Sequence, residues 1–459
     1  MSTVVAILAA ITSPVEKVAW DAGFFYLKPV MILALCLASM QFARAATGST
    51  RIRRDLWLMV FLFACLSATH LCSALLSGQL FGREAMARAL EWSVLYLILY
   101  ALFVGLVLHA ANASRWRLLV HSWMGIGLIL SMYGFAQVLA AAQGIDLDSS
   151  VLAALRANPG RQGLDRLGSL SYRMTSMMGD SNNFGAFMTT VWPLYFASWI
   201  ESVYLKRSRA AVVGLICTAL CVLALLLTLS RSAWLGSFVA LAVVLWKARG
   251  MVSRRMGVFV FVGFAILTAA VTALSDPEIG AVVRLRWVDP PQLEIDARLM
   301  LYNAALGLFA RSPVFGTGLG SYEFGLEKFF QVQRERANPH SAYLSWLSDT
   351  GVSGFVVNIL ILALIFRQLR LFETRNMGTL RGRILSGGLT AGFVGWMVTN
   401  VFYQSYTYQY AWVFQALVFS SGSVVLRGPV GRRSLHAGRA DRDPCEEDQS
   451  PCSALLRTP

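Results

Sequence analysis

The chain has 459 residues, of which 56% are hydrophobic and 14% charged, and its formal net charge is +15. Together with a mean hydropathy of +0.57, this composition excludes an ordinary soluble domain. Apolar stretches of about 18 or more residues, enough to cross a ~30 Å hydrocarbon layer as a helix, recur along nearly the whole chain. They do not alternate apolar and polar residues as barrel strands would, so we expect an all-α polytopic membrane protein.

The positive charge is gathered in alternate short loops. The basic clusters lie at residues 44–54, 115–117, 206–209, 247–255 and 367–383, and in the tail from Arg427. This is the positive-inside pattern, so the basicity indicates orientation and no nucleic-acid partner is expected. The seven cysteines form no pair of CxxC motifs, so neither a disulfide framework nor a zinc site is indicated.

Hydropathy predicts eleven membrane spans. They lie near residues 28–43, 56–78, 93–112, 118–142, 183–205, 211–229, 232–247, 256–275, 352–369, 384–403 and 408–426. Residues 4–12 are apolar but short and fit an interfacial or partly inserted helix. Eleven spans place the N-terminus outside, and counting this segment as a twelfth moves it inside. The first basic residue is Lys17, which argues against a cleaved signal peptide, so the first span is expected to stay as an anchor.

Two long loops fall on the predicted outer face. The predicted parts are an N-terminal transmembrane bundle, an outer loop domain, C-terminal transmembrane helices and a disordered cytoplasmic tail, at residues 1–274, 275–351, 352–426 and 427–459. The bundle has its own outer loop at 143–182. Residues 297–311 show helical spacing of Leu and Phe, so the second loop is expected to hold two or more helices packed over the outer mouth of the bundle.

Four polar segments on the outer side could carry chemistry. They are YRM at 172–174 with GDSNNF at 179–184, LSRSAW at 229–234, DAR at 296–298 with GTGLG at 316–320, and NPHS at 338–341. Arginine suits a diphosphate because guanidinium makes paired, charge-assisted hydrogen bonds and stays charged near lipid. Arginines beside a histidine would stabilise a phosphate leaving group while the histidine takes a proton from an attacking hydroxyl. His340 lies where the second loop meets an apolar span, a place where ionisable groups are costly.

Each residue also has a structural explanation. Arg231, in a tight turn between spans, fits an interfacial anchor or a contact to lipid phosphate. Arg298 could form a surface ion pair with Asp296 or Glu294. His340 could cap the following helix or bond a backbone carbonyl.

Two further patterns point away from phosphate loops and metals. The glycines of 316–320 fit a turn better than a phosphate loop, because no strand precedes them and no GKS/T follows. The only Asp-x-Asp, at 146–148, is a short match, and no His/Asp/Glu cluster with ligand spacing accompanies it. We therefore predict neither a metal site nor a cofactor.

The order of the segments is more specific than any one of them. SRSAWLG on a span, then DxR, then SPVFGTGLGSYEF, then NPHSAYLSWLSDTGVSGF resembles the O-antigen ligase and polymerase superfamily of bacterial envelope glycosyltransferases, over about residues 165–370. The resemblance implies a GT-C-type helical bundle of about 11–12 transmembrane helices with a large helical periplasmic loop. It also implies a glycan donor on undecaprenyl diphosphate and a reaction without metal or nucleotide sugar.

The resemblance also assigns roles to residues. Arg231 and Arg173 would face the diphosphate, His340 would be catalytic or position the acceptor, and Arg298 would support the loop or the sugar-phosphate site. The supporting residues are Asn338, Ser341, Asn183 and Ser230. This sequence has Tyr302 and Ser341 where Trp and Asn are more common in the family.

The expected function is inverting transfer of a glycan to an acceptor hydroxyl at the periplasmic face of the inner membrane. A ligase would use the lipid A core as acceptor, a polymerase a second lipid-linked glycan, and a related branch a protein Ser or Thr. The residues are common to all three, and we place the ligase first and the polymerase second. A membrane transporter is the alternative of another class, but it would be expected to show acids or broken helices near mid-membrane, and the predicted spans hold almost no Asp or Glu.

Overall fold

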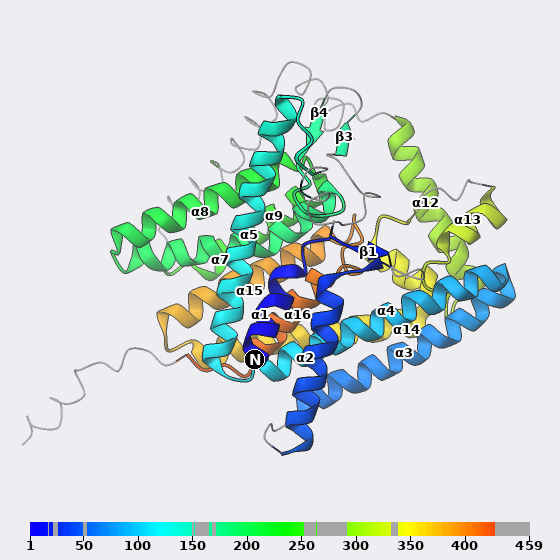
Figure 1. Ribbon diagram of the computed structural model, residues 1–459, viewed down its shortest axis with the longest axis horizontal. Helices are drawn as coiled ribbons and strands as arrows, with labels where there is room; N and C mark the ends of the chain where they lie inside the picture. Colours follow the sequence, from blue (N-terminus) through cyan, green and yellow to red (C-terminus); the bar gives the residue numbers. More distant parts are fainter. Residues whose placement is uncertain are drawn as a thin grey trace, which may run out of the picture.

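The computed structural model describes residues 1–16, 18–21, 26–48, 53–148, 151, 165–167, 171–251, 263, 292–331 and 338–426. This part of the chain is a bundle of helices with two short antiparallel hairpins (Figure 1). The helices are α1 Ser2–Thr12, α2 Pro29–Ala46, α3 Arg54–Phe81, α4 Arg83–His109, α5 Ala113–Ala142, α7 Ser181–Tyr204, α8 Ser208–Leu227, α9 Arg231–Lys247, α12 Gln292–Arg311, α13 Tyr322–Phe330, α14 Ala342–Asn376, α15 Leu380–Thr399 and α16 Gln409–Ser421. The strands are β1 Trp20–Asp21, β2 Tyr26–Leu27, β3 Asp165–Leu167 and β4 Ser171–Arg173, with Trp20 opposite Leu27 and Asp165 opposite Arg173.

Ten of the eleven predicted spans coincide with helices; the other, 256–275, lies outside the described residues apart from Gly263. Among the described residues, six helices are long and apolar enough to cross a membrane: α2, α3, α4, α5, α8 and α14. The chain is therefore an all-α polytopic membrane protein. The total of eleven or twelve spans and the GT-C type of bundle stay predictions.

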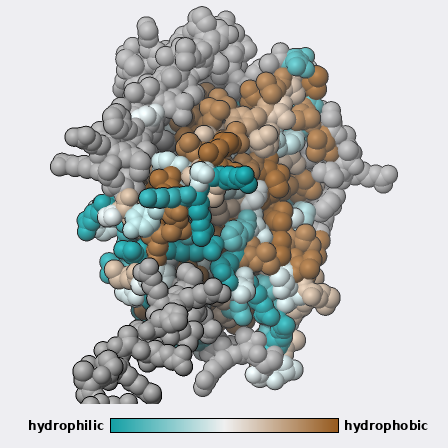
Figure 2. All heavy atoms as spheres, turned by 90° about the vertical axis from the view of Figure 1, so that its left-hand side faces the viewer, coloured by the Kyte–Doolittle hydropathy of each residue, from teal (hydrophilic) through white to brown (hydrophobic). Residues whose placement is uncertain are grey.

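The outside of the bundle is apolar, as a lipid-facing surface requires. Large apolar side chains point outward from several helices, including Phe61 on α3, Ile129 on α5 and Val213 on α8, each about 60% exposed. Figure 2 shows a broad hydrophobic area beside hydrophilic side chains on the face that lies at the left of Figure 1. A patch of this extent would be unusual on a soluble monomer, because exposure of so much apolar surface to water is unfavourable.

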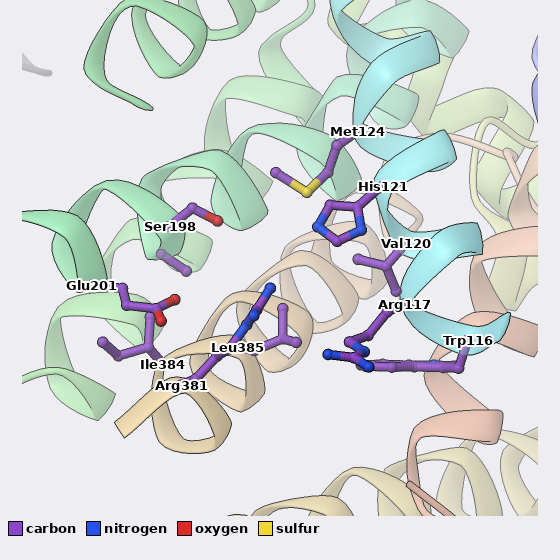
Figure 3. Close-up of a pocket in the computed structure, with 11 residues that line it drawn as sticks. Trp116, Arg117, Val120, His121, Met124, Ser198, Glu201, Arg381, Ile384 and Leu385 are labelled. Atoms are coloured by element: carbon purple, nitrogen blue, oxygen red, sulfur yellow. The ribbon is translucent and has the colours of Figure 1, made fainter. Parts of the chain in front are cut away.

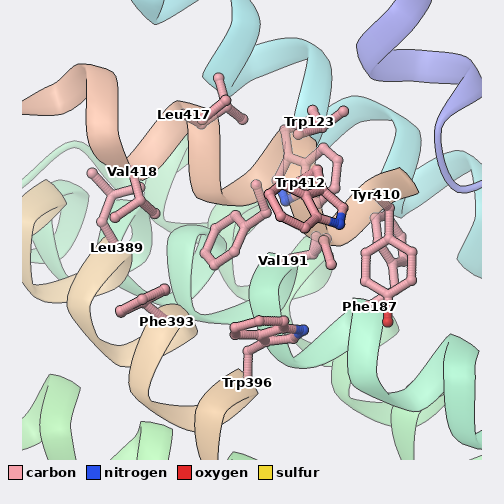
Figure 4. Close-up of a cluster of buried hydrophobic side chains, with 14 of the residues drawn as sticks. Trp123, Phe187, Val191, Leu389, Phe393, Trp396, Tyr410, Trp412, Leu417 and Val418 are labelled. Carbon is pink, nitrogen blue, oxygen red and sulfur yellow. The ribbon is translucent and has the colours of Figure 1, made fainter. Parts of the chain in front are cut away.

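Helix α16 forms the centre of the core and differs from its predicted extent of 408–426. It has 13 residues, about 20 Å of helix, and every one of them is buried. Aromatic rings from α5, α7 and α15 surround it (Figure 4). The Trp123 ring lies 5.0 Å from that of Phe187 and 5.9 Å from that of Phe414. Such ring pairs each contribute about 0.5–1.5 kcal/mol beyond the area that they bury.

Glycines let α15 approach its neighbours closely. A Cβ at Gly395 would lie 2.7 Å from the Gly236 carbonyl oxygen of α9, and a Cβ at Gly392 would lie 3.2 Å from the Thr190 carbonyl oxygen of α7. Small residues at such crossings are the usual means of packing helices in membranes, where the hydrophobic effect does not drive their association. Helix α7 is thereby held along α15, which fixes the position of its first turn.

A kink divides α14 and explains the glycine-rich loop. The predicted span began at 352, but helical structure begins at Ala342 and is interrupted at Gly351, where φ is 63° and ψ −164°. The loop before α13 satisfies the backbone groups that the kink frees. Thr317 N–H donates to the Ser348 carbonyl at 2.8 Å, and Val352 N–H donates to the Pro313 carbonyl at 2.8 Å. The glycines of 316–320 thus form a structural clamp on α14.

The second predicted loop contains the two helices α12 and α13. Helix α12 covers the predicted stretch 297–311, begins earlier, at Gln292, and packs against α14. Helix α13 packs against α12 and α3. The pair meets α14 near its start, so α12 lies beside the segment that carries His340 (Figure 1).

Candidate functional site

Arg173 fastens three segments at one end of the bundle. Its side chain is 8% exposed. Its Nε–H donates to the Thr228 carbonyl at 3.0 Å, and its Nη2 donates to Asn182 Oδ1 at 2.9 Å. Strand β4, the end of α8 and the first turn of α7 are therefore joined through one guanidinium group. Because burying an unpaired charge is costly, these bonds fix the side chain as well as the segments.

The turn after α8 presents Arg231. Arg231 is the first residue of α9, and Ser230 is its N-cap. The turn is tight, because Leu229 has a φ of 51°, in the left-handed region that non-glycine residues rarely occupy. Since Arg173 bonds to Thr228, three residues before Arg231, the structure brings these two arginines together at the same turn.

The first turn of α7 connects this turn to the His340 segment. Asp180, the N-cap of α7, accepts the Asn183 N–H at 2.9 Å through Oδ1 and the Tyr403 hydroxyl at 2.5 Å through Oδ2. The Tyr403 carbonyl in turn accepts the N–H of Ala342 at 3.1 Å. Hydrogen bonds, together with the short stretch of backbone from Asn182 to Asp180, thus connect the arginine turn to the residue that lies two positions after His340.

The backbone around His340 is shaped to present the imidazole. Asn338 Oδ1 accepts the His340 N–H at 2.8 Å, which closes an Asx-turn, and His340 has a φ of 46°. Ser341 then caps α14 by accepting the Leu344 N–H at 3.5 Å. The cap is therefore Ser341, not His340, and no other described residue forms a hydrogen bond with the imidazole ring.

Backbone strain is concentrated in this region. Five non-glycine residues among the described ones have positive φ, and three of them are Ser176, Leu229 and His340. Left-handed conformations cost about 1–3 kcal/mol and persist where the surroundings impose them, most often at functional sites. Their presence next to the arginine turn and at the histidine marks the end of the bundle that also holds Arg173.

Arg298 completes the set from α12. Its side chain is partly exposed, and its positive charge acts on His340. The pKa of His340 lies below its ordinary value of 6.5, first because burial disfavours the charged ring and second because Arg298 repels the added proton. The imidazole is therefore neutral at neutral pH, as a general base must be.

A buried acid lies behind the first turn of α7. Glu16 is 3% exposed, and its Oε2 accepts the Asn183 Nδ2–H at 2.6 Å and the Gly179 N–H at 3.1 Å. Its other oxygen has no hydrogen-bond partner among the described residues. Burial raises the pKa of Glu16, an effect that Lys28 opposes. Asn183 is thus a link between this acid and α7.

Sequence analysis did not single out Glu16 or Tyr403. Glu16 lies between two apolar segments, and Tyr403 opens the tyrosine-rich stretch YQSYTYQY before α16. Neither pattern indicates a partner 167 or 223 residues away, which is the separation of Glu16 from Asn183 and of Tyr403 from Asp180. The signal available was compositional: an isolated acid, and a tyrosine cluster on the predicted outer side.

The described residues contain no group of three or more His, Cys, Asp or Glu side chains positioned for a metal ion.

Residues 216–359 match the protein family described as O-antigen ligase. This segment contains Arg231, Arg298 and His340, whereas Arg173 and Asn183 lie before it. One similar curated protein is the teichuronic acid biosynthesis protein TuaE of Bacillus subtilis (strain 168), 24% identical over 261 residues. The match covers 55% of this chain and 52% of that relative, so the chain spans about half the length of the protein it resembles.

Proposed function

We propose that this chain, a member of the O-antigen ligase and polymerase superfamily, transfers a glycan from a polyprenyl diphosphate to an acceptor hydroxyl at the end of the bundle that holds His340. The observation that carries the proposal is the connection, through hydrogen bonds and the first turn of α7, from Arg173 and the turn before Arg231 to the His340 segment. It joins a cationic group and a neutral base from segments far apart in sequence.

In the proposed reaction, Arg231 and Arg173 bind the diphosphate, and Arg298 contributes further positive charge. Neutral His340 accepts the proton of the acceptor hydroxyl while that oxygen forms a bond to the anomeric carbon. The bond from the anomeric carbon to the diphosphate oxygen breaks with inversion, and its electrons stay on the departing diphosphate. Fixed guanidinium groups favour this step because they stabilise the charge without having to reorganise.

Two acceptors have support. The family description favours the O-antigen ligase type, in which a lipid A core sugar is the acceptor. The likeness to a protein of teichuronic acid biosynthesis supports the second candidate, in which a second lipid-linked glycan is the acceptor and a polymer results. In both, the donor is a glycan on undecaprenyl diphosphate, and the site faces the periplasm from the inner membrane.

The test uses the full chain reconstituted in liposomes with a lipid-linked oligosaccharide and measures release of polyprenyl diphosphate. His340→Ala and Arg231→Ala should each lower the rate about 10²-fold or more. Arg209→Ala is the matched control, because this exposed arginine lies at the start of α8, outside the proposed site. Release that is the same in all three variants would rule out the mechanism.

The acceptor is identified in the same assay. With wild-type protein, addition of lipid A core should increase glycan transfer if the chain is a ligase. Added donor alone should give longer glycans if it is a polymerase. Separating the products by size distinguishes the two outcomes.

A further inference from the structure

A polar cavity lies at the end of the bundle opposite the proposed site. Its volume is about 40 Å³, and its polar wall consists of Arg117 and His121 on α5, Ser198 and Glu201 on α7, and Arg381 on α15 (Figure 3). Helix α7 starts beside the proposed site at Ser181 and reaches the cavity at Ser198 to Glu201, so about 25–30 Å of helix separates the two. The cavity therefore takes no part in the glycan transfer proposed above.

The cavity has an excess of positive charge. Two guanidinium groups, of Arg117 and Arg381, face one carboxylate, that of Glu201. The N-terminal turns of α5 and of α15 line the cavity, and neither helix has an acidic residue in its first turn. Helix N-termini carry a partial positive charge, so both helix ends add to the charge of the arginines instead of offsetting it. The cavity is therefore suited to an anion.

Two other cations at this end are paired with carboxylates. Lys247 Nζ lies 2.5 Å from Glu373 Oε1, and Arg367 Nη1 lies 2.7 Å from Asp55 Oδ1. By contrast, the side chains of Arg117 and Arg381 form no hydrogen bond or ion pair with another described residue. The charge of the two arginines that line the cavity is thus available to a ligand.

The size and walls of the cavity limit that ligand. A cavity of this volume holds about three water-sized groups, which suits the oxygens of one phosphate but not a sugar ring. Arginine matches phosphate because its fork makes paired hydrogen bonds. The remaining wall is apolar, and Leu118, next to Arg117, is 41% exposed. Hydrophilic and hydrophobic side chains meet on the face in Figure 2, as they do where a protein contacts lipid headgroups.

We propose that this cavity binds a single phosphate-bearing anion through Arg117 and Arg381, with His121 and Ser198 as further hydrogen-bonding groups. The phosphate can be that of an anionic phospholipid headgroup or of a soluble compound. The chemistry is the same for both sources, and the apolar wall favours the lipid.

The test measures the thermal unfolding midpoint of the full-length protein in detergent. Short-chain phosphatidylglycerol, short-chain phosphatidylcholine and inorganic phosphate at matched ionic strength are titrated separately. Phosphatidylglycerol should raise the midpoint, and phosphatidylcholine should not. The Arg117→Gln/Arg381→Gln double variant should need about tenfold to thirtyfold more phosphatidylglycerol for the same shift. Arg207→Gln/Arg209→Gln is the control, because it removes equal charge from exposed positions at the same end of α7 and α8.

The outcomes separate the sources and can overturn the site. A shift with phosphatidylglycerol that the first double variant weakens and the control keeps supports the lipid as ligand. If inorganic phosphate gives as large a shift as phosphatidylglycerol, and the Arg117→Gln/Arg381→Gln variant loses it, the site is supported with a soluble ligand. If the double variant fails to fold, Arg381→Gln, a change at an exposed side chain, is used instead. It should raise the phosphatidylglycerol concentration needed for the same shift by about half as much on a logarithmic scale. No selective shift, or equal titrations in both double variants, would overturn the proposal.

Discussion

The two ends of the bundle carry the same kinds of ionisable side chain in different settings. Arginine, glutamate and histidine occur at both: Arg173, Glu16 and His340 at one, and Arg381, Glu201 and His121 at the other. At the proposed glycan-transfer site Arg173 and Glu16 are buried and bonded to named partners. At the cavity their counterparts are partly or fully exposed, and their side chains form no hydrogen bond or ion pair with another described residue. Burial thus requires fixed geometry, whereas exposure leaves charge available to a ligand.

Replacing one arginine at each end should give the largest contrast. Arg173→Ala leaves the Thr228 carbonyl and the Asn182 amide oxygen without their donor, so we expect a loss of about 2–4 kcal/mol in unfolding free energy and about 10²-fold in transfer rate. Arg381→Ala should change stability by less than about 0.5 kcal/mol. Denaturation in detergent and the liposome assay measure both quantities. The comparison of the two ends fails if the two variants behave alike.

A pair of glycines tests the same contrast in the backbone. At Gly351 the positive φ alone costs a β-carbon about 1–3 kcal/mol. That atom would also lie 2.5 Å from the Val314 carbonyl, so Gly351→Ala should lower the unfolding midpoint strongly. Gly378, just after the far end of α14, has nothing within 4 Å of a Cβ, and Gly378→Ala should be close to neutral. Size-exclusion profiles and thermal unfolding give the result. Equal stability would show that the clamp on α14 does not need glycine.

Sequence alone could locate the helices and the segments of the proposed site. Hydropathy found ten of the described helices because a helix exposed to lipid must be apolar over its length. It misjudged the extent of α16, since hydropathy counts apolar residues without knowing whether lipid or protein surrounds them. It also started α14 about ten residues late, because the Ser and Asp residues before Gly351 were assigned to a loop. Their burial depends on the docked glycine-rich loop, which no local pattern reveals.

The site residues divide in the same way. Arg173, Arg231 and His340 stood out because they lie on the predicted outer side, away from the basic loops, and in recognisable segments. Glu16 and Tyr403 did not, since their importance comes only from partners brought close by the fold. The cavity likewise depends on three helix ends meeting, and each of its arginines is, in sequence, one more positive-inside residue.

Glu16 should make stability depend on pH. Its folded pKa is raised above 4.5 by burial, so below pH 4.5 the group is protonated in both states and carries no penalty. As the pH rises through the window above 4.5, the unfolded state ionises first and the folded state loses stability, by about 1.4 kcal/mol for each unit of the shift. Glu16→Gln keeps an acceptor for Asn183 and Gly179 but cannot ionise. The unfolding midpoint of the wild type should therefore fall relative to that of this variant with increasing pH. Glu201→Gln is the control at a less buried acid. If the wild-type midpoint falls with pH relative to this variant by the same amount, burial of Glu16 is not the cause.

The smallest effect concerns the pH at which His340 works. Its pKa is lowered by burial and, to a lesser extent, by Arg298, so the rate should fall only as the pH drops below about 6.5. Arg298→Gln removes the repulsion and leaves the burial, so the acid limb of the rate profile should move to higher pH without reaching the value for a free imidazole. The position of the limb, not the height of the profile, is the readout, because loss of Arg298 can also weaken diphosphate binding. Arg311→Gln, an equal change of charge at the other end of α12, should leave the limb in place. If Arg298→Gln also leaves it in place, Arg298 does not tune His340, and its part in the site is limited to the substrate.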